Sequence, residues 1–224
     1  MLDWLPENIS TYGGEIDKFF YVIYYITTVV FFLVTGFLLY CLIKYRHKEG
    51  QKGKYYHGNT TLEFIWTGAT LIALLVLALV SALVWSKIKQ EIPPTDIIVQ
   101  VTGKQFNWEF LYPGPDKIFA TEDDYQIDNQ LHVPVDKPIR LILKSKDVIH
   151  SFFVPVLRLK QDLVPGREIA AWFEATKAGK YEIPCAELCG FGHSGMLGYL
   201  FVHSAQDYND WVEKTWPAKN ASTP

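Results

Sequence analysis

Soft metal ligands are concentrated in one short stretch of this 224-residue chain. The stretch spans the twelve residues 185–196 and contains Cys185, Glu187, Cys189, His193 and Met196. Thiolate and thioether sulfur select copper rather than hard cations, because soft ligands prefer soft ions. The composition of the stretch therefore predicts a copper site.

The number of ligands favours two copper ions. A mononuclear blue-copper site needs two histidines, one cysteine and a weak axial methionine. With His150 upstream, the sequence offers this set and a second cysteine. Two thiolates can each bridge two ions, so that each ion receives both sulfurs and one imidazole. The weak positions would then fall to Met196 and to a backbone carbonyl, that of Glu187.

Two other interpretations of these residues remain open. Zinc also binds cysteine and histidine, but it explains neither Met196 nor a fifth ligand. In an oxidising compartment, Cys185 and Cys189 could form a disulfide if the short loop satisfies its geometry. The disulfide would leave His150, His193 and Met196 unexplained.

Two apolar segments precede the metal-ligating residues. Residues 19–43 and 64–86 carry no charge over 25 and 23 residues, and about 20 suffice to cross a bilayer. The segment between them has five basic residues and one acidic residue (Lys44, Arg46, Lys48, Lys52, Lys54 and Glu49). By the positive-inside rule, we predict a transmembrane hairpin over 19–92, with a cytoplasmic loop at 44–61. Residues 1–18 would lie on the outer side.

A β-rich pattern begins near residue 95. Apolar residues alternate there, and strand-like runs follow at 105–112, 138–144, 149–154, 167–174, 179–184 and 197–203. Many short strands separated by turn residues are typical of a β-sandwich or barrel. The amphipathic pattern at about 205–216 predicts a helix, with Ser204 as N-cap and Trp211 as a docking residue. We predict an outer domain over 93–216 and a tail at 217–224.

The net charge and the position of Glu63 give two further indications of function. The net charge of −3 argues against a nucleic-acid partner, which needs a basic face. Glu63 stands at the inner mouth of the second apolar segment, where the run from Thr60 to Glu63 fits a capping box. A carboxylate at the membrane surface is also a candidate for proton uptake.

Taken together, these features resemble subunit II of haem-copper cytochrome c oxidase. The family's C-x-E-x-C-G-x-x-H-x-x-M motif is unbroken from Cys185 to Met196. Three further motifs of the family appear as Asp147-Val-Ile-His150-Ser-Phe, as Leu159-Lys160-Gln161-Asp162 followed by Pro165-Gly166-Arg167, and as Glu63-Phe-Ile-Trp-Thr67.

The resemblance implies a fold and a metal centre. The fold is an N-terminal two-helix transmembrane hairpin plus an all-β, cupredoxin-like Greek-key domain that holds CuA, a pair of copper ions. The implied copper ligands are His150, Cys185, Glu187 through its carbonyl, Cys189, His193 and Met196. The Glu187 side chain is expected to reach a magnesium ion shared with subunit I. Glu63 is expected at the start of a proton path into subunit I.

The resemblance also implies a role and partners. The chain would accept electrons from a c-type cytochrome and pass them to haem in subunit I of a proton-pumping oxidase, where oxygen is reduced. Subunit III and membrane lipid are further expected partners. The run Gln105-Phe106-Asn107-Trp108 departs from the usual Gln-Trp-x-Trp. This departure favours a bacterial plasma membrane, with the domain in the periplasm, over a mitochondrial inner membrane.

Departures from the family bear on how electrons arrive. Phenylalanine is harder to oxidise than tryptophan, so an electron entering at Phe106 must tunnel; Trp108 is a second candidate. Arg158 stands where glycine is common. No C-x-x-C-H occurs, so no haem c domain is fused to the chain. Acidic residues suggest a docking face for a basic cytochrome; they are Glu109, Asp116, Glu122, Asp123, Asp124 and Asp147.

Two rival functions can be compared with this one. A copper-free quinol-oxidase subunit II shares the architecture but lacks the copper ligands that this chain carries. A membrane-tethered copper delivery or storage protein would need exposed, exchangeable ligands, whereas five side-chain ligands suit a closed site.

Overall fold

The chain divides into two compact units in the computed structural model, which describes residues 4–53 and 55–217. Residues 15–90 form one unit, which contains nearly all of helices α1 (Gly13–Lys44) and α2 (Thr60–Gln90). The second unit combines the residues up to 14 with those from 91 onward. Most of the predicted tail lies outside the described residues.

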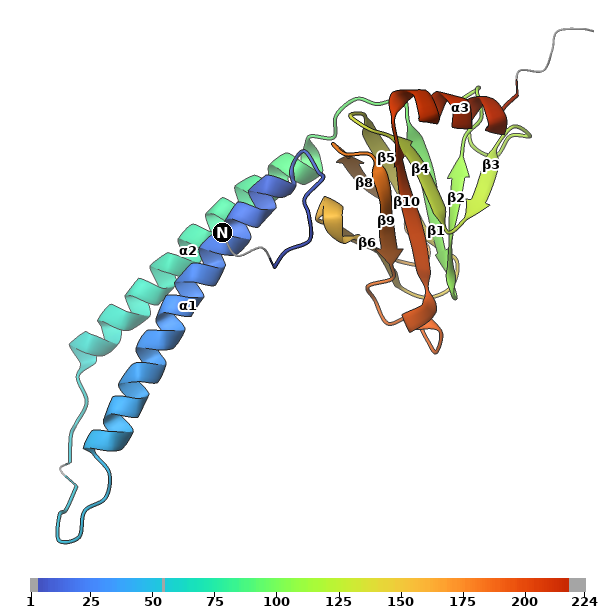
Figure 1. The fold of residues 1–224 in the computed structure, drawn as a ribbon. Helices are drawn as coiled ribbons and strands as arrows, with labels where there is room; N and C mark the ends of the chain where they lie inside the picture. The colour runs from blue at the N-terminus through green and yellow to red at the C-terminus, as the bar shows by residue number, and fades with distance from the viewer. Residues whose placement is uncertain (1–3, 54, 218–224) are drawn as a thin grey trace, which may run out of the picture. The chain divides into compact units, whose positions relative to one another are not determined.

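Helices α1 and α2 are long and apolar enough to cross a membrane. They run antiparallel and are joined by the loop at 45–59 (Figure 1). Each contains one of the predicted charge-free runs. Helix α1 begins earlier than its run because Glu15 and Asp17 fall in the first turns, where carboxylates interact favourably with the helix dipole. The helical part is therefore a membrane-anchoring hairpin.

The N-cap of α2 is one residue earlier than predicted. Asn59 Oδ1 accepts a hydrogen bond from the Leu62 N–H at 3.1 Å, and Thr60 is already the first helical residue. The capping box predicted on Thr60 is therefore wrong, because Asn59 fills the role. Glu63 lies in the first turn with an exposed side chain.

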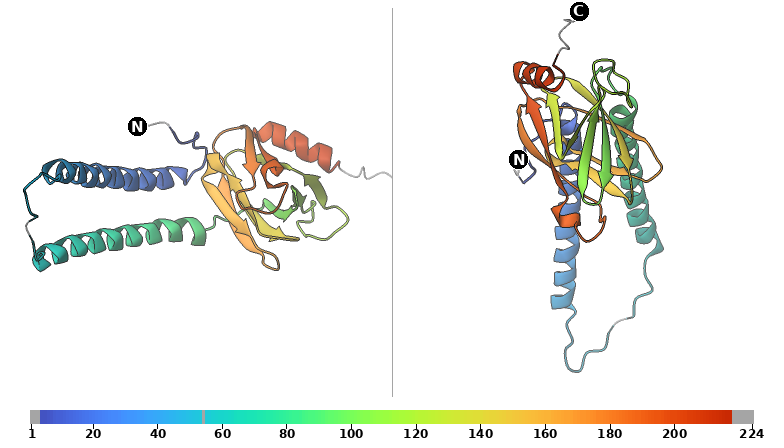
Figure 2. Two further views of the ribbon diagram at one scale, coloured as in Figure 1. Left: turned by 90° about the horizontal axis from the view of Figure 1, so that it is seen from below. Right: turned by 90° about the vertical axis from the view of Figure 1, so that its right-hand side faces the viewer.

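The second unit is a β-domain in which three sheets enclose one core (Figures 1 and 2). The five-stranded sheet has the order β3 (Tyr125–Asp128), β2 (Asn107–Tyr112), β1 (Ile98–Lys104), β5 (Pro138–Ser145) and β8 (Ile169–Glu174). The three-stranded sheet has the order β4 (Gln130–Pro134), β10 (Leu197–His203) and β9 (Gly179–Pro184). Strands β6 (His150–Val154) and β7 (Leu159–Leu163) form a pair. The predicted all-β class is confirmed, although the predicted runs missed β3, β4 and β7.

Trp108 ties the three sheets together at the centre of the core. It projects from β2 and is completely buried. Its ring meets Phe152 of β6 edge-on, with centroids 5.7 Å apart. Its indole N–H donates to the carbonyl of Ile183 on β9 at 3.1 Å. One side chain from the first strand hairpin therefore positions both strands that flank the candidate site.

The C-terminal helix α3 (Ala205–Thr215) lies across one end of the sheets, and the β9–β10 loop projects from the other (Figures 1 and 2). Ser204 is the N-cap, because its side chain accepts a hydrogen bond from the Asp207 N–H. Trp211 stacks on His132 with centroids 4.9 Å apart. The predicted cap and docking residue are both confirmed.

The segment before α1 belongs to the β-domain. Ile9 is 1% exposed, and its N–H donates to the Val156 carbonyl at 3.0 Å. Ser10 forms a β-bridge with Ala175. Since this segment and the β-domain form one compact unit, they lie on the same side of any membrane that α1 and α2 span.

Arg158 fastens this segment. Its backbone is left-handed, with φ at 55°, in the region where glycine is favoured. Its guanidinium donates to the Pro155 carbonyl at 2.8 Å and to the Pro6 carbonyl at 2.7 Å. The arginine at this usual glycine position therefore binds two backbone carbonyls of its own chain.

We predict that Ile9→Ala lowers the free energy of unfolding of the β-domain by about 2–4 kcal/mol, the usual cost of truncating a buried isoleucine. Denaturant titration of the whole chain in detergent micelles, followed by tryptophan fluorescence, measures the change. The control is Glu7→Gln, which breaks only an exposed ion pair with Lys177 and should cost less than about 1 kcal/mol. Equal stability of the two variants would contradict the packing of this segment.

Candidate metal centre

The twelve-residue stretch forms the loop of the β9–β10 hairpin. Pro184 pairs with Leu197 at the end of the two strands. One step further, the Cys185 N–H donates to the Met196 carbonyl at 3.0 Å. A single 3₁₀ turn at His193–Gly195 brings the chain back. The first and last residues of the stretch are therefore held side by side.

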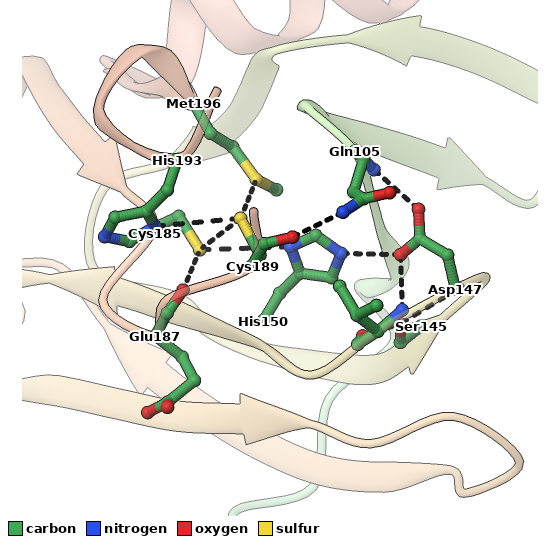
Figure 3. Close-up of polar contacts among 10 residues, drawn as sticks. Gln105, Ser145, Asp147, His150, Cys185, Glu187, Cys189, His193 and Met196 are labelled. Atoms are coloured by element: carbon green, nitrogen blue, oxygen red, sulfur yellow. Dashed lines mark hydrogen bonds and ion pairs between the residues drawn. The ribbon is translucent and has the colours of Figure 1, made fainter. Parts of the chain in front are cut away.

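Five side chains converge at the base of this loop (Figure 3). We call them the sulfur–imidazole cluster: His150, Cys185, Cys189, His193 and Met196. The two Sγ atoms lie 3.9 Å apart. Cys185 Sγ is 3.9 Å from His150 Nδ1, and Cys189 Sγ is 3.7 Å from His193 Nδ1. Met196 Sδ is 3.9 Å from Cys189 Sγ. The structure thus brings together all five side chains predicted from the sequence.

Strand β6 supplies His150 from outside the loop. Two residues after His150, Phe152 forms a β-bridge with Cys185. The Ala186 N–H donates to the Ser151 carbonyl at 3.0 Å. These contacts align the start of β6 with the start of the loop. A Cβ on Gly103 of β1 would lie 3.0 Å from the His150 ring, so the imidazole is held closely on that side.

Glu187 turns its backbone and its side chain in different directions. Its carbonyl oxygen lies 3.3 Å from Cys185 Sγ. Its carboxylate points away from the sulfur atoms (Figure 3) and is exposed. The two groups of one residue can therefore contact different ligands.

Asp147 and Gln105 form a second layer around the cluster. Asp147 Oδ1 lies 2.7 Å from His150 Nε2. Because a carboxylate only accepts hydrogen bonds, this contact places the proton on Nε2 and turns the lone pair of Nδ1 toward Cys185. Gln105 donates from its N–H to Asp147 at 2.7 Å and from its side chain to the Cys189 carbonyl at 2.5 Å.

The electrostatics of the two layers differ. Burial and the nearby thiol of Cys185 raise the pKa of Cys189 to about 11, so without a cation this thiol keeps its proton. Burial alone would raise the pKa of Asp147, but hydrogen bonds from the Gln105 N–H, His150 and the Val148 N–H together lower it. A negative charge is therefore stable on Asp147, whereas the thiolate of Cys189 needs a bound cation.

The spacing of the cluster suits metal ions. Ligands bound at about 2.0–2.3 Å to one tetrahedral ion lie about 3.3–3.8 Å from one another. The sulfur–nitrogen and sulfur–sulfur distances of 3.7–3.9 Å lie at or about 0.1 Å above the upper end of this range. A disulfide is absent, since both cysteines are free. The donor set of two thiols, a thioether and two imidazoles fits copper better than a hard cation.

Phe106 lies over the loop, and Trp108 lies beneath it. The Phe106 side chain is 39% exposed, and a Cβ on Gly192 would lie 2.5 Å from its ring. Trp108 is completely buried, with its ring centroid 6.1 Å from that of His150. Only Phe106 of this pair is available to touch a docked protein.

The six acidic residues do not form one face. Glu109 is 6% exposed and is bound by Lys104 and by Lys146. Burial alone would raise its pKa, but the two lysines together lower it. The Asp147 carboxylate accepts a hydrogen bond from His150. The other four belong to the 113–124 loop, which joins β2 to β3.

The fold and the cluster define a class of protein: a β-domain on a membrane-anchoring hairpin, with a soft-metal site in one strand loop. Comparison with known families gives the same class in more detail. Residues 97–201 match the family described as cytochrome C oxidase subunit II, periplasmic domain. Residues 4–84 match the transmembrane domain of the same subunit.

Relatives agree with the family match. The chain is 34% identical to the alternative cytochrome c oxidase subunit 2 of Bradyrhizobium diazoefficiens, over 94% of this chain and 83% of the relative. It is 30% identical to cytochrome c oxidase subunit 2 of Synechocystis, over 97% and 77% of the two chains. A crystal structure of the periplasmic domain of subunit II from Bradyrhizobium japonicum is 31% identical and covers 55% of this chain and 96% of its own, with a TM-score of 0.49.

The chain belongs to the subunit II family of cytochrome c oxidase, as the sequence motifs had indicated. It is therefore a membrane-anchored subunit of a haem-copper oxidase and a partner of subunit I. The family implies copper binding, and His150, Cys185 and Cys189 form a possible metal site.

We predict that Asp147→Ala lowers copper affinity about 10–100-fold, the usual effect of removing a partner that orients a ligand histidine. Asp147→Asn should lose less, because its amide oxygen still accepts a hydrogen bond. Competition with a chromophoric chelator, on the whole chain in detergent, measures the affinity. Glu122→Gln, on the exposed β2–β3 loop, is the control. Unchanged affinity in Asp147→Ala would show that His150 needs no orienting group.

Proposed function

We propose that the sulfur–imidazole cluster holds two copper ions, and that this chain accepts electrons for a proton-pumping cytochrome c oxidase. One observation carries the proposal. The two cysteine sulfurs lie 3.9 Å apart, and each has its own imidazole nitrogen, His150 for Cys185 and His193 for Cys189. This arrangement offers each of two ions one histidine and a share in both thiolates.

A copper pair supplies one-electron chemistry. The chain buries most of the ligands and balances the charge of the pair. His150, Cys185, Cys189 and Met196 are buried, and His193 is partly exposed. Two thiolates nearly neutralise the pair, which reduces the cost of burying an ion. Met196 and the Glu187 carbonyl approach from different sides, and each would supply a weak ligand.

The same burial argues against the rival functions. A copper delivery or storage protein must release its ion, and release is slow when four of the five side-chain ligands are buried. A quinol-oxidase subunit II without copper has no use for this set of ligands. We therefore retain the role of relay, from a c-type cytochrome to haem in subunit I.

The direction of the chain in the membrane is part of the proposal. The loop between α1 and α2 is basic and short, which favours the cytoplasmic side. The β-domain and the segment before α1 would then face the periplasm of a bacterium. Subunit III and lipid remain expected neighbours of the hairpin.

Electron spin resonance tests the copper pair directly. The whole chain, purified in detergent and loaded with copper, should show the hyperfine pattern of one electron shared by two copper nuclei. Cys189→Ser removes one of the two sulfurs and should abolish that pattern. Cys41→Ser, on α1, is the matched control and should preserve it. A one-copper pattern in the unaltered chain would refute the copper pair.

Glu187→Gln separates the two groups of that residue in the same experiment. We propose that its exposed carboxylate binds a magnesium ion shared with subunit I, while its carbonyl faces the copper pair. The variant should keep the two-copper pattern, because the carbonyl is unchanged. In the assembled oxidase it should lose the signal of manganese substituted for magnesium. Retention of the manganese signal would exclude Glu187 as a magnesium ligand.

We further propose that Glu63 takes up protons at the cytoplasmic surface, because its side chain is exposed in the first turn of α2 and Asn59, not Glu63, caps the helix. Glu63→Gln should slow proton uptake by the assembled oxidase in vesicles at least several-fold while leaving the copper spectrum intact. Glu49→Gln, in the loop that precedes α2, is the control. Equal uptake rates in the two variants would refute this role.

A further inference from the structure

The side chain of Gln105 links the metal loop, residues 185–196, to a separate hairpin. Gln105 lies in the two-residue turn between β1 and β2, because Lys104 pairs with Asn107 on either side of it. Its amide donates to the Cys189 carbonyl at 2.5 Å (Figure 3). A two-residue turn fixes the register of its hairpin, and β1 is the central strand of the five-stranded sheet. The donor of this hydrogen bond is therefore held on a firm part of the β-domain.

The two halves of the metal loop are supported differently. Cys185 is held by the strands at the base of the loop, through its N–H bond to the Met196 carbonyl and its β-bridge with Phe152. Cys189 lies beyond the end of β9, in the irregular part of the loop. The hydrogen bond from Gln105 ties the backbone of Cys189 to the β1–β2 hairpin. Loss of this bond would leave the Cys189 half of the loop less constrained than the Cys185 half.

A glycine in the metal loop leaves room for this amide. Gly190 has φ at 135°, and a Cβ there would lie 2.6 Å from the Gln105 amide nitrogen. A residue with a Cβ at this position would push the amide away from the Cys189 carbonyl. The loop backbone and the Gln105 side chain are therefore fitted closely to each other.

The second hydrogen bond of Gln105 comes from its backbone. This N–H donates to Asp147 at 2.7 Å, and the Asp147 carboxylate accepts a hydrogen bond from His150. A substitution of the Gln105 side chain leaves the backbone N–H in place. The contact with Cys189 can therefore be removed while the contact with Asp147 is kept.

The Gln105 amide also affects how readily a metal site in this loop accepts an electron. Reduction adds one negative charge, and the Asp147 carboxylate already places one beside the cluster. The N–H end of the amide dipole points at the residue that carries the second thiol, Cys189, where it stabilises added negative charge. Hydrogen bonding around a ligand cysteine tunes the reduction potential of copper sites. This hydrogen bond therefore favours the reduced form.

We propose that Gln105 is a positioning residue for the copper pair, and that its amide both fixes the Cys189 half of the metal loop and raises the reduction potential of the site. The inference rests on the proposed function and adds a residue that acts through a ligand without being one. Because its effect is on the loop as well as on the metal, it can be measured with and without copper.

Hydrogen exchange on the copper-free chain in detergent tests the positioning. Gln105→Leu keeps the approximate size of the side chain and removes the donor. The backbone amides of residues 186–193 should then exchange about two- to tenfold faster, as expected when one hydrogen bond is lost, and those of β1 should not change. Gln126→Leu, at an exposed position on β3, is the matched control and should alter neither. Unaltered exchange of the loop in Gln105→Leu overturns the proposal.

Spectroelectrochemistry on the copper-loaded chain tests the reduction potential. The midpoint potential of Gln105→Leu should lie below that of the unaltered chain, because the reduced form has lost a stabilising dipole. Gln126→Leu should have the potential of the unaltered chain. A potential in Gln105→Leu that equals or exceeds that of the unaltered chain overturns the proposal.

Gln105→Asn is a second variant in case Gln105→Leu does not fold. Its amide is one methylene shorter and does not reach the Cys189 carbonyl, so loop exchange and potential should shift in the same directions as in Gln105→Leu. Values equal to those of the unaltered chain would speak against any role of the amide and overturn the proposal.

The spin resonance spectrum of the unaltered chain separates this proposal from the proposed function. A one-copper pattern there refutes the proposed function, whereas the exchange of the copper-free loop still decides whether Gln105 positions Cys189. A two-copper pattern together with an unshifted potential in the Gln105 variants defeats only the role of Gln105.

Discussion

The hydrogen bond from the Cys185 N–H to the Met196 carbonyl is the contact on which the site depends. Without it, the β9–β10 loop would be a flexible segment whose sulfur atoms had many arrangements to lose on binding a metal. When the loop is closed, one 3₁₀ turn places His193 beside Cys189. Alignment of β6 with Cys185 then places His150 beside the same cluster. Most of the ordering of the ligands is thus achieved by folding, before any ion arrives.

The same closure creates an electrostatic problem that the chain solves locally. Burial and the neighbouring thiol raise the pKa of Cys189, so its thiolate forms only when a cation compensates the charge. Asp147 could have aggravated this by adding another buried charge. Instead, its carboxylate is held by backbone N–H groups and faces the far nitrogen of His150, where it orients the ring. The buried charge of Glu109 is likewise compensated locally, because Lys104 and Lys146 both bind its carboxylate.

Much of this organisation can be predicted from the sequence, because its signals are local. Charge-free runs specify the hairpin, and the spacing from Cys185 to Met196 specifies the cluster. What cannot be predicted depends on contacts between distant residues. Strand β7 is short and carries Lys160 and Asp162, so it looks like a loop until β6 pairs with it. Asn129, with φ at 58°, lets the chain leave one sheet after β3 and join another as β4. Asp147 looks like a surface carboxylate until the fold places it against His150.

The docking of Ile9 and Ser10 on the β-domain bears on how the protein is made. Their partners include Ala175 and Thr176, more than 160 residues later in the chain. In the orientation proposed above, the first segment crosses the membrane during synthesis and is completed by its partners only after both helices have inserted and β8 has been made. Contacts so distant in sequence form slowly. Closure of this segment is therefore suited to be a late step of biogenesis, one that reports that the hairpin has inserted in the correct orientation.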